Sequence, residues 1–243
     1  MPCSMWPAVL LLGDSQTQQG WAAGGWVAGL ADALTRRADV LNRGLSGYNS
    51  RMVRAVLPDL CSAEQWRAAK VVVILLGSND ASLPETNPEQ AVPVEEFGEN
   101  LLHILSFLLG VGVPREAVVL VTPPPVLPEQ WAAACSARPG PPAANCKSEA
   151  LTRAVAGEVA AVAARLGVTL VDLHQELTKP GVHLPAVLSD GLHLGPQGSA
   201  ALLALLAPVI LGKLGAAAPP LMPEWRQLDN ADVAAAYTRW KAQ

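Results

Sequence analysis

Short runs of apolar residues alternate with longer amphipathic stretches along this chain. The apolar runs, which we expect to be strands, cover residues 8–12, 39–42, 71–76, 117–122 and 169–173. The intervening stretches space their apolar positions near the helical period, and the expected helices cover residues 26–37, 50–57, 94–109, 148–166 and 196–214. Unbroken apolar runs are typical of strands that are buried on both faces, and strands that alternate with helices usually form a parallel sheet. The pattern therefore predicts an α/β fold with a mostly parallel sheet.

The first apolar run stops abruptly at a Gly-Asp-Ser triplet. Residues 9–12 read Val-Leu-Leu-Leu, and Gly13, Asp14 and Ser15 follow directly. This order places Asp14 and Ser15 at the carboxyl end of a buried strand, which is the edge of an open α/β sheet where ligands bind. Ser15 is therefore a candidate nucleophile. The segment alone is equally compatible with a turn residue or a helix N-cap at this position.

Polar segments also follow the second and third predicted strands. Gly44 and Gly47 lie after the second strand, where they suggest a tight turn with close backbone approach. Asn79 lies after the third strand, within the segment Gly-Ser-Asn-Asp. Because parallel strands place their carboxyl ends on one rim, the N–H groups of Ser15 and Gly47 and the amide of Asn79 are candidate donors to an oxyanion. Taken alone, Asn79 is more often a turn former.

A serine nucleophile needs a base, and the chain offers four histidines. They are His103, His174, His183 and His193. The first lies in an apolar helical stretch, and the third lies in a Pro/Gly loop with no acid close in sequence. His193 follows Asp190 by three residues in a glycine-containing turn, so the carboxylate can reach Nδ1 and leave Nε2 for the serine. His174, two residues after Asp172 at the end of the fifth strand, competes with it, and spacing does not decide between the two.

Composition and charge limit the classes of partner and the number of domains. The chain is 51% hydrophobic and 16% charged, has a net charge of −4 and contains no basic run. This balance argues against nucleic acid or an anionic membrane as a partner. No long linker divides the alternation, so we expect one domain over 1–243, with a tail from about residue 216. Residues 123–147 are rich in proline and are expected to form an irregular excursion. Together with residues 82–93 they are expected to wall the substrate pocket.

Cysteine usage and apolar length bear on the cellular compartment. The four cysteines are Cys3, Cys61, Cys135 and Cys146. None forms a C-x-x-C pair, which leaves a metal site or redox pair unsupported. Cys135 and Cys146 bracket one loop, but free thiols are favoured because the first residues lack the features of a secretory signal. The longest apolar stretch, 200–211, is interrupted by Pro208 and is shorter than a membrane span. We therefore expect a cytoplasmic protein with no membrane span.

Several motifs of other enzyme classes are missing from the sequence. There is no G-x-S-x-G, no P-loop, no G-x-G-x-x-G and no H-E-x-x-H. These absences disfavour the α/β-hydrolase nucleophile elbow, nucleotide binding by the common loops and the zincin metal site. Neither a cofactor nor a metal ion is expected.

Four segments, taken together and in order, resemble the GDSL, or SGNH, family of esterases and lipases. The segments are Gly13–Ser15, Asn42–Gly47, Gly77–Asp80 and Asp190–His193. The resemblance implies a flavodoxin-like three-layer α/β/α sandwich with a five-stranded parallel sheet. It also implies that Ser15 is the nucleophile, His193 the general base and Asp190 its orienting acid. The implied oxyanion hole consists of Ser15 N–H, Gly47 N–H and the Asn79 amide, and the implied partner is a small-molecule ester.

Within that family the chain is similar to the isoamyl acetate-hydrolysing esterase group. The residues that carry this similarity are Gly47–Arg51, Asn79–Ala81 and Trp225-Arg226. The group implies short-chain, acetyl-type esters as substrates. Gln16 departs from the apolar residue that usually follows the nucleophile, and this difference bears on the local turn or on the substrate pocket.

Two other functions fit parts of the same pattern. One is a metal-dependent phosphoesterase that uses Asp14, Asn79, Asp80 and a histidine. The other is a binding module that keeps the fold without turnover. An activated serine would separate both from an esterase, because only the esterase requires one.

Overall fold

The computed structural model describes residues 6–137, 145–215 and 220–242 of the chain. Within these residues, five parallel strands form one sheet in the order β2-β1-β3-β4-β5. The strands are β1 (Ala8–Gly13), β2 (Asp39–Gly44), β3 (Ala69–Leu75), β4 (Val118–Val121) and β5 (Thr169–Val171). This is the flavodoxin-like strand order. All five strands lie within two residues of their predicted bounds.

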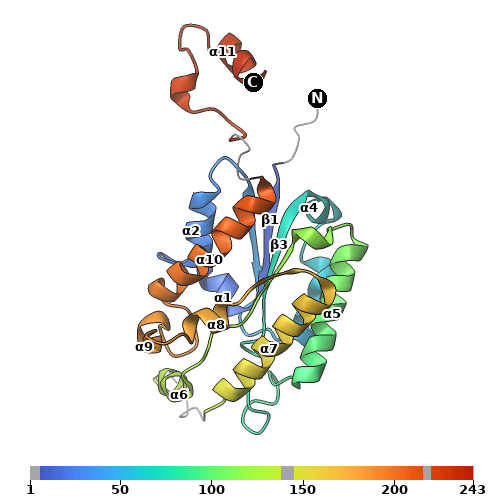
Figure 1. The fold of residues 1–243 in the computed structure, drawn as a ribbon, viewed down its shortest axis with the longest axis vertical. Helices are drawn as coiled ribbons and strands as arrows, with labels where there is room; N and C mark the ends of the chain where they lie inside the picture. Colours follow the sequence, from blue (N-terminus) through green and yellow to red (C-terminus); the bar gives the residue numbers. More distant parts are fainter. Residues whose placement is uncertain (1–5, 138–144, 216–219, 243) are drawn as a thin grey trace.

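Helices cover both faces of the sheet, which confirms the predicted three-layer α/β/α fold (Figure 1). The α-helices are α1 (Ser15–Gln18), α2 (Trp26–Ala33), α3 (Ser50–Val56), α4 (Ala63–Ala68), α5 (Val94–Gly110), α6 (Pro128–Ser136), α7 (Glu149–Leu166), α8 (Leu173–Leu177), α9 (Leu184–Val187), α10 (Pro196–Leu214) and α11 (Val233–Lys241). Short 3₁₀ turns are η1 (Gln19–Trp21), η2 (Leu57–Asp59), η3 (Arg115–Ala117) and η4 (Trp225–Gln227).

Side chains of β1 alternate between two separate apolar layers, as the pleat of a strand requires. Leu10 and Leu12 belong to the layer that includes residues of α3, α5 and α7. Val9 and Leu11 belong to the layer that includes residues of α2, α8 and α10. Every residue of β1 is buried, as predicted from its unbroken apolar run. The carboxyl end of this strand is consequently held rigidly from both sides.

The prediction of an irregular excursion over residues 123–147 is wrong for part of that segment. Residues 128–136 form α6, with Pro128 in its first turn, where a proline costs no hydrogen bond. Residues 138–144 lie outside the described part of the chain. The sequence also predicts a loop over residues 179–194, between the fifth predicted strand and the last predicted helix, and this segment contains the short helix α9. In both places a proline that suggested a loop in the sequence begins or enters a helix.

Two predicted helices differ from the observed ones. α2 ends at Ala33 rather than Arg37, and Arg36 takes a φ of 61°, which an α-helix cannot continue through. A proline in a helix interior is expected to kink or split the helix, yet α10 runs unbroken through Pro208, from Pro196 to Leu214. Pro208 and Ala204 both lie on the exposed face of α10, so solvent can reach the carbonyl of Ala204 that lacks its helical donor.

One described helix, α10, has the length and apolar composition of a membrane span, and 28% of its most apolar stretch is buried. Core helices of folded domains pass the same test. The inner face of α10 packs against α2 and the sheet through Leu202, Leu206 and Ile210, all fully buried. This packing accounts for the apolar character of the helix.

The C-terminal segment 220–242 extends beyond the end of the sheet at which β1 begins (Figure 1). Arg36 connects it to the rest of the protein. The carbonyl of Arg36 accepts a hydrogen bond from Leu221 N–H at 2.8 Å, and its guanidinium donates to the carbonyl of Pro223 at 3.0 Å and pairs with Glu224. Trp225 in this segment is 71% exposed. Cys61, Cys135 and Cys146 form no disulfide in the described part of the chain.

Candidate active site

The loops that follow β1, β2 and β3 meet at the carboxyl edge of the sheet. The N–H of Leu45, after β2, donates to the carbonyl of Gly13 at 2.9 Å. The amide of Asn79, after β3, donates to the carbonyl of Tyr48 at 2.8 Å. Gly44 permits this close approach, since a Cβ there would lie 2.2 Å from the backbone nitrogen of Gln18. Three of the four segments singled out in the sequence therefore lie on one rim.

The fourth segment brings His193 to Ser15 on the same rim. Nε2 of His193 lies 2.9 Å from Oγ of Ser15, although the two residues are 178 positions apart. Nδ1 of His193 lies 2.7 Å from Oδ2 of Asp190. With its proton on Nδ1, the imidazole donates to Asp190 and offers the Nε2 lone pair to the hydroxyl of Ser15. A serine, a histidine and a carboxylate thus form a connected relay.

Asp190 orients both the ring and the backbone of His193. Its Oδ1 accepts hydrogen bonds from the N–H groups of Leu192 at 3.0 Å and of His193 at 2.8 Å. Burial alone would raise the pKa of Asp190. The hydrogen bonds from the ring and N–H of His193 and from Leu192 N–H outweigh burial and lower the pKa to about 2. Asp190 therefore remains ionised at neutral pH.

The tryptophan of α6 covers the ring of His193. Trp131 and His193 meet edge to face with ring centroids 5.5 Å apart. Gly191, at φ +88°, lets the loop pass this close, because a Cβ there would lie 2.7 Å from Trp131 N. The sequence interpretation missed Trp131 because its segment was taken as irregular. A proline followed by an apolar-rich run was the signal that could have indicated α6.

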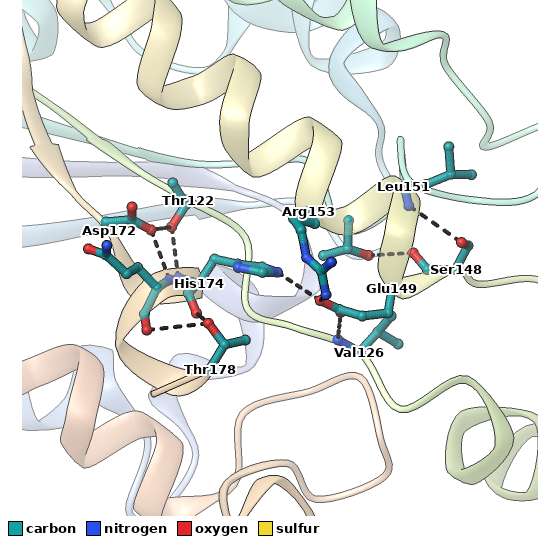
Figure 2. A network of polar contacts seen from close by, with 11 residues as sticks. Thr122, Val126, Ser148, Glu149, Leu151, Arg153, Asp172, His174 and Thr178 are labelled. Atoms are coloured by element: carbon teal, nitrogen blue, oxygen red, sulfur yellow. Dashed lines mark hydrogen bonds and ion pairs between the residues drawn. The ribbon is translucent and has the colours of Figure 1, made fainter. Parts of the chain in front are cut away.

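His174, the competing histidine, is not brought to Ser15. Its Nε2 lies 3.0 Å from Oε1 of Glu149, and its N–H donates to Oγ1 of Thr122 at 2.8 Å (Figure 2). Asp172 caps α8 by accepting from Gln175 N–H at 3.0 Å. His174 thus belongs to a partly buried polar network that connects the residue after β4 with α7 and α8.

The three predicted oxyanion donors lie at the ends of β1, β2 and β3. Ser15 opens α1, and neither its N–H nor that of Gly47 donates a hydrogen bond to any described residue. Gly47 has a φ of +83°, and its carbonyl accepts from the Gln90 amide at 2.8 Å. Because one amide hydrogen of Asn79 is bound to Tyr48, the orientation of the second is fixed. Fixed neutral donors of this kind suit an oxyanion.

Gln16, the residue that departs from the family pattern, bridges the backbone on both sides of His193. Its Nε2 donates to the carbonyl of Leu192 at 2.7 Å, and its Oε1 accepts from Leu194 N–H at 3.1 Å. Its own carbonyl accepts from the indole of Trp26 at 2.8 Å. Gln16 is 3% exposed. The side chain beside Ser15 therefore anchors the loop that carries His193.

A buried lysine lies behind the candidate oxyanion donors. Lys147 donates from Nζ to the carbonyl of Ser78 at 2.7 Å and to Oγ of Ser82 at 2.8 Å. Burial lowers the pKa of Lys147. Burial also raises the pKa of Asp14 to about 7, and a second buried carboxyl, Asp80, opposes its ionisation further. No spacing or motif in the sequence pointed to Lys147.

A cavity of about 220 Å³ lies beside Ser15 and His193. Apart from Ser15 and Gln16, its walls come from two parts of the chain. The lining residues are Gln19, Gly20, residues 22–26, Ser189, residues 193–196 and Ser199. This differs from the expectation that 82–93 and 123–147 wall the pocket. Residues of 82–93 line a separate cavity of about 460 Å³ that Ser15 and His193 do not border.

The described residues include no group of three or more histidines, cysteines, aspartates or glutamates arranged to hold a metal ion. Asp14 and Asp80, which the phosphoesterase interpretation required, are buried and engaged by backbone donors. Oδ1 of Asp14 accepts from Gln16 N–H at 2.9 Å, and Oδ1 of Asp80 accepts from Ser50 N–H at 2.9 Å. These contacts give both carboxylates structural roles.

A family profile and sequenced relatives match most of this chain. The profile of the GDSL-like Lipase/Acylhydrolase family matches residues 11–201. A Mus musculus protein named isoamyl acetate-hydrolyzing esterase 1 homolog is 40% identical over 232 residues, covering 93% of this chain and 90% of that protein. The Bos taurus protein of the same name is 41% identical with the same coverage.

Solved structures share the fold at lower identity. A lipase/acylhydrolase from Enterococcus faecalis matches with a TM-score of 0.68 and 23% identity, covering 89% of this chain and 99% of that one. A catalytic mutant of Axe2, an acetylxylan esterase from Geobacillus stearothermophilus, matches with a TM-score of 0.63 and 20% identity, covering 88% and 97%. Both similarities concern the three-layer architecture.

Proposed function

The chain belongs to the GDSL-like lipase/acylhydrolase family and is a carboxylic ester hydrolase, and from this premise we propose that it acts through an acyl-enzyme on Ser15. The observation that carries the proposal is the relay from Ser15 through His193 to Asp190, with contacts of 2.9 and 2.7 Å. A serine hydroxyl is a weak nucleophile until a neighbouring base takes its proton, and this geometry supplies the base and its orienting carboxylate.

In the first half of the proposed reaction, Oγ of Ser15 attacks the ester carbonyl while Nε2 of His193 takes the hydroxyl proton. The carbonyl oxygen becomes an oxyanion that accepts hydrogen bonds from Ser15 N–H, Gly47 N–H and the Asn79 amide. The tetrahedral species then collapses, and the imidazolium of His193 gives its proton to the departing alcohol oxygen. Asp190 stabilises the imidazolium throughout, since its lowered pKa keeps it charged.

In the second half, water replaces the alcohol. His193 takes a proton from the water as the water oxygen attacks the acyl carbon, and the same donors hold the new oxyanion. Collapse releases the carboxylic acid and returns the proton to Ser15. Apart from the ester and water, every group in these steps is a side chain or backbone N–H of this chain.

We propose short, acetyl-type acyl groups for the substrate. Two observations support a small acyl group. The curated relatives carry isoamyl acetate in their names, and a structural neighbour is an acetylxylan esterase. The sequence-based subgroup similarity supports the same class.

Substitution of the serine tests the proposal. Ser15→Ala should lower turnover of p-nitrophenyl acetate by a factor on the order of 10⁴ to 10⁶, as loss of the nucleophile does in comparable relays. His193→Ala should have a similar effect. His174→Ala, the matched control, should have a mild one, because His174 contacts Glu149 instead of Ser15. Full activity of pure Ser15→Ala protein, or equal losses in both histidine variants, would overturn the assignment.

A further inference from the structure

The cavity beside Ser15 lies between two glycine-containing segments that are far apart in the sequence. One is the turn before α2, residues 19–25, and the other is the start of α10, residues 195–199. The two walls are close, since a Cβ placed on Gly24 would lie 3.5 Å from Cβ of Pro196. Ser15 and His193 both border the space. The cavity therefore opens onto the reacting hydroxyl and the base.

The position of the cavity relative to the relay distinguishes the two halves of an ester. In the proposed mechanism the carbonyl oxygen turns toward Gly47 and Asn79, neither of which lines the cavity. The alcohol oxygen must lie within reach of Nε2 of His193, because that atom delivers its proton. His193 does line the cavity. We infer that this cavity is the subsite for the leaving alcohol, an inference that rests on the proposed function.

The lining identifies the chemical class of that alcohol. The described residues around the cavity include no aspartate, glutamate, lysine or arginine, and glycine, alanine, Trp26, Leu194 and Pro196 supply much of the wall. A charged headgroup would enter without a counter-charge, which is costly away from water. The amide of Gln16 is already bound to Leu192 and Leu194 and offers no replacement. Gln19, Ser189 and Ser199 add polar but uncharged groups to the lining. The subsite therefore favours an uncharged alcohol.

The volume accommodates an alcohol of moderate size. The cavity measures about 220 Å³, and at about 30 Å³ for each atom the size of a water molecule it has room for about seven non-hydrogen atoms. A 3-methylbutyl group with its oxygen has six. Exposed residues such as Ala23 and Gly24 border the cavity, so a larger alcohol can extend toward solvent.

Ser199 provides the substitution that tests the inference. It is 4% exposed, lines the cavity from α10 and takes no part in the relay. Ser199→Leu reduces the available space, and Ala23→Leu does so from the exposed rim of the opposite wall, where folding is less at risk. Ala200→Leu is the matched control, because it adds the same side chain one residue along α10 at an exposed position outside the cavity.

Two series of esters measure the effect through kcat/KM in a pH-stat. The first contains methyl, butyl and 3-methylbutyl acetates, and the second contains methyl acetate, butanoate and hexanoate. In Ser199→Leu and Ala23→Leu, kcat/KM for 3-methylbutyl acetate divided by kcat/KM for methyl acetate should fall at least tenfold. Single methylene groups in a tight pocket alter kcat/KM by about 10–200-fold. The corresponding ratio of kcat/KM for methyl hexanoate and methyl acetate should change less than about twofold. Ala200→Leu should preserve both ratios.

Two results would overturn the inference. If the variants change the kcat/KM ratios of the acyl series but not those of the alcohol series, the cavity holds the acyl group. If neither series responds in either variant, the cavity is not a substrate subsite. Failure of the proposed function gives a different result, because Ser15→Ala would then hydrolyse methyl acetate as fast as the unmodified protein.

Discussion

At the scale of single residues, Gln16 links the nucleophile and the base more directly than any side chain outside the relay. Its amide contacts the backbone immediately before and immediately after His193, and its own backbone follows Ser15. Displacement of the imidazole by about 1 Å can cost about a hundredfold in rate, so the anchoring of this loop matters to catalysis. We interpret Gln16 as a positioning residue.

Removal of this anchor should reduce turnover with little effect on binding. Gln16→Met retains the length of the side chain but leaves the carbonyl of Leu192 and the N–H of Leu194 without their partner. The expected result is a fall in kcat of about 10- to 100-fold, with KM for p-nitrophenyl acetate within about twofold. Gln197→Met, at an exposed position on α10, is the control. An unchanged kcat in Gln16→Met would show that the loop of His193 holds its place without the anchor.

The sequence alone indicated Ser15 as a candidate nucleophile and left the base undecided between His174 and His193. Asp172 precedes His174 and Asp190 precedes His193, and both pairs have plausible spacing. The family resemblance selected His193, and the fold places its ring at Ser15. Trp131, Lys147 and the contacts of Gln16 were not predicted, because each depends on chain segments that only tertiary structure brings together.

At the scale of elements, the strands were predicted more accurately than the helices. Strands β1, β3 and β4 contain short, unbroken apolar runs such as Val71–Leu75, which are typical of buried strands. Proline was the main source of error. Pro128 begins α6, and Pro208 lies within α10 on a face where solvent reaches the backbone. In each case the position of the proline in the helix determines whether it ends the helix.

The N-cap of α1 makes stability depend on pH. Oδ1 of Asp14 accepts from Gln16 N–H, while burial raises the pKa of this carboxyl from 3.8 to about 7. The folded protein therefore retains the proton over a range in which the unfolded chain has released it. The free energy of unfolding should fall as pH rises from about 4 to about 7 and level off above that.

Asp14→Asn should remove this dependence while keeping the capping acceptor. Within that pH range, the free energy of unfolding of the unmodified protein should fall by about 1.4 kcal/mol for each pH unit. The difference in free energy of unfolding between Asp14→Asn and the unmodified protein should therefore shift in favour of the variant by about 2–3 kcal/mol from pH 5 to pH 8. Urea unfolding at both pH values measures the gain, and Asp59→Asn, at an exposed position, is the control. An equal response to pH in Asp14→Asn and unmodified protein would contradict the burial argument.

At the scale of the whole molecule, the site combines both ends of the sequence on one edge of the sheet. Ser15 comes from the first strand, and His193 comes from the loop before the last helix of the sheet layers. The segment 220–242 lies toward the opposite end of the strands (Figure 1). Parallel strand order explains the convergence, because each βα unit returns its functional loop to the same rim.

Covalent labelling tests the activated serine most directly. The full-length protein is treated with an alkyl fluorophosphonate in buffer containing EDTA and digested, and the adduct is located by mass spectrometry. We predict one adduct, on Ser15, that is absent in Ser15→Ala and forms at least about 100-fold more slowly in His193→Ala. Ester hydrolysis that persists without an adduct on Ser15, or that is lost in EDTA, would contradict this prediction.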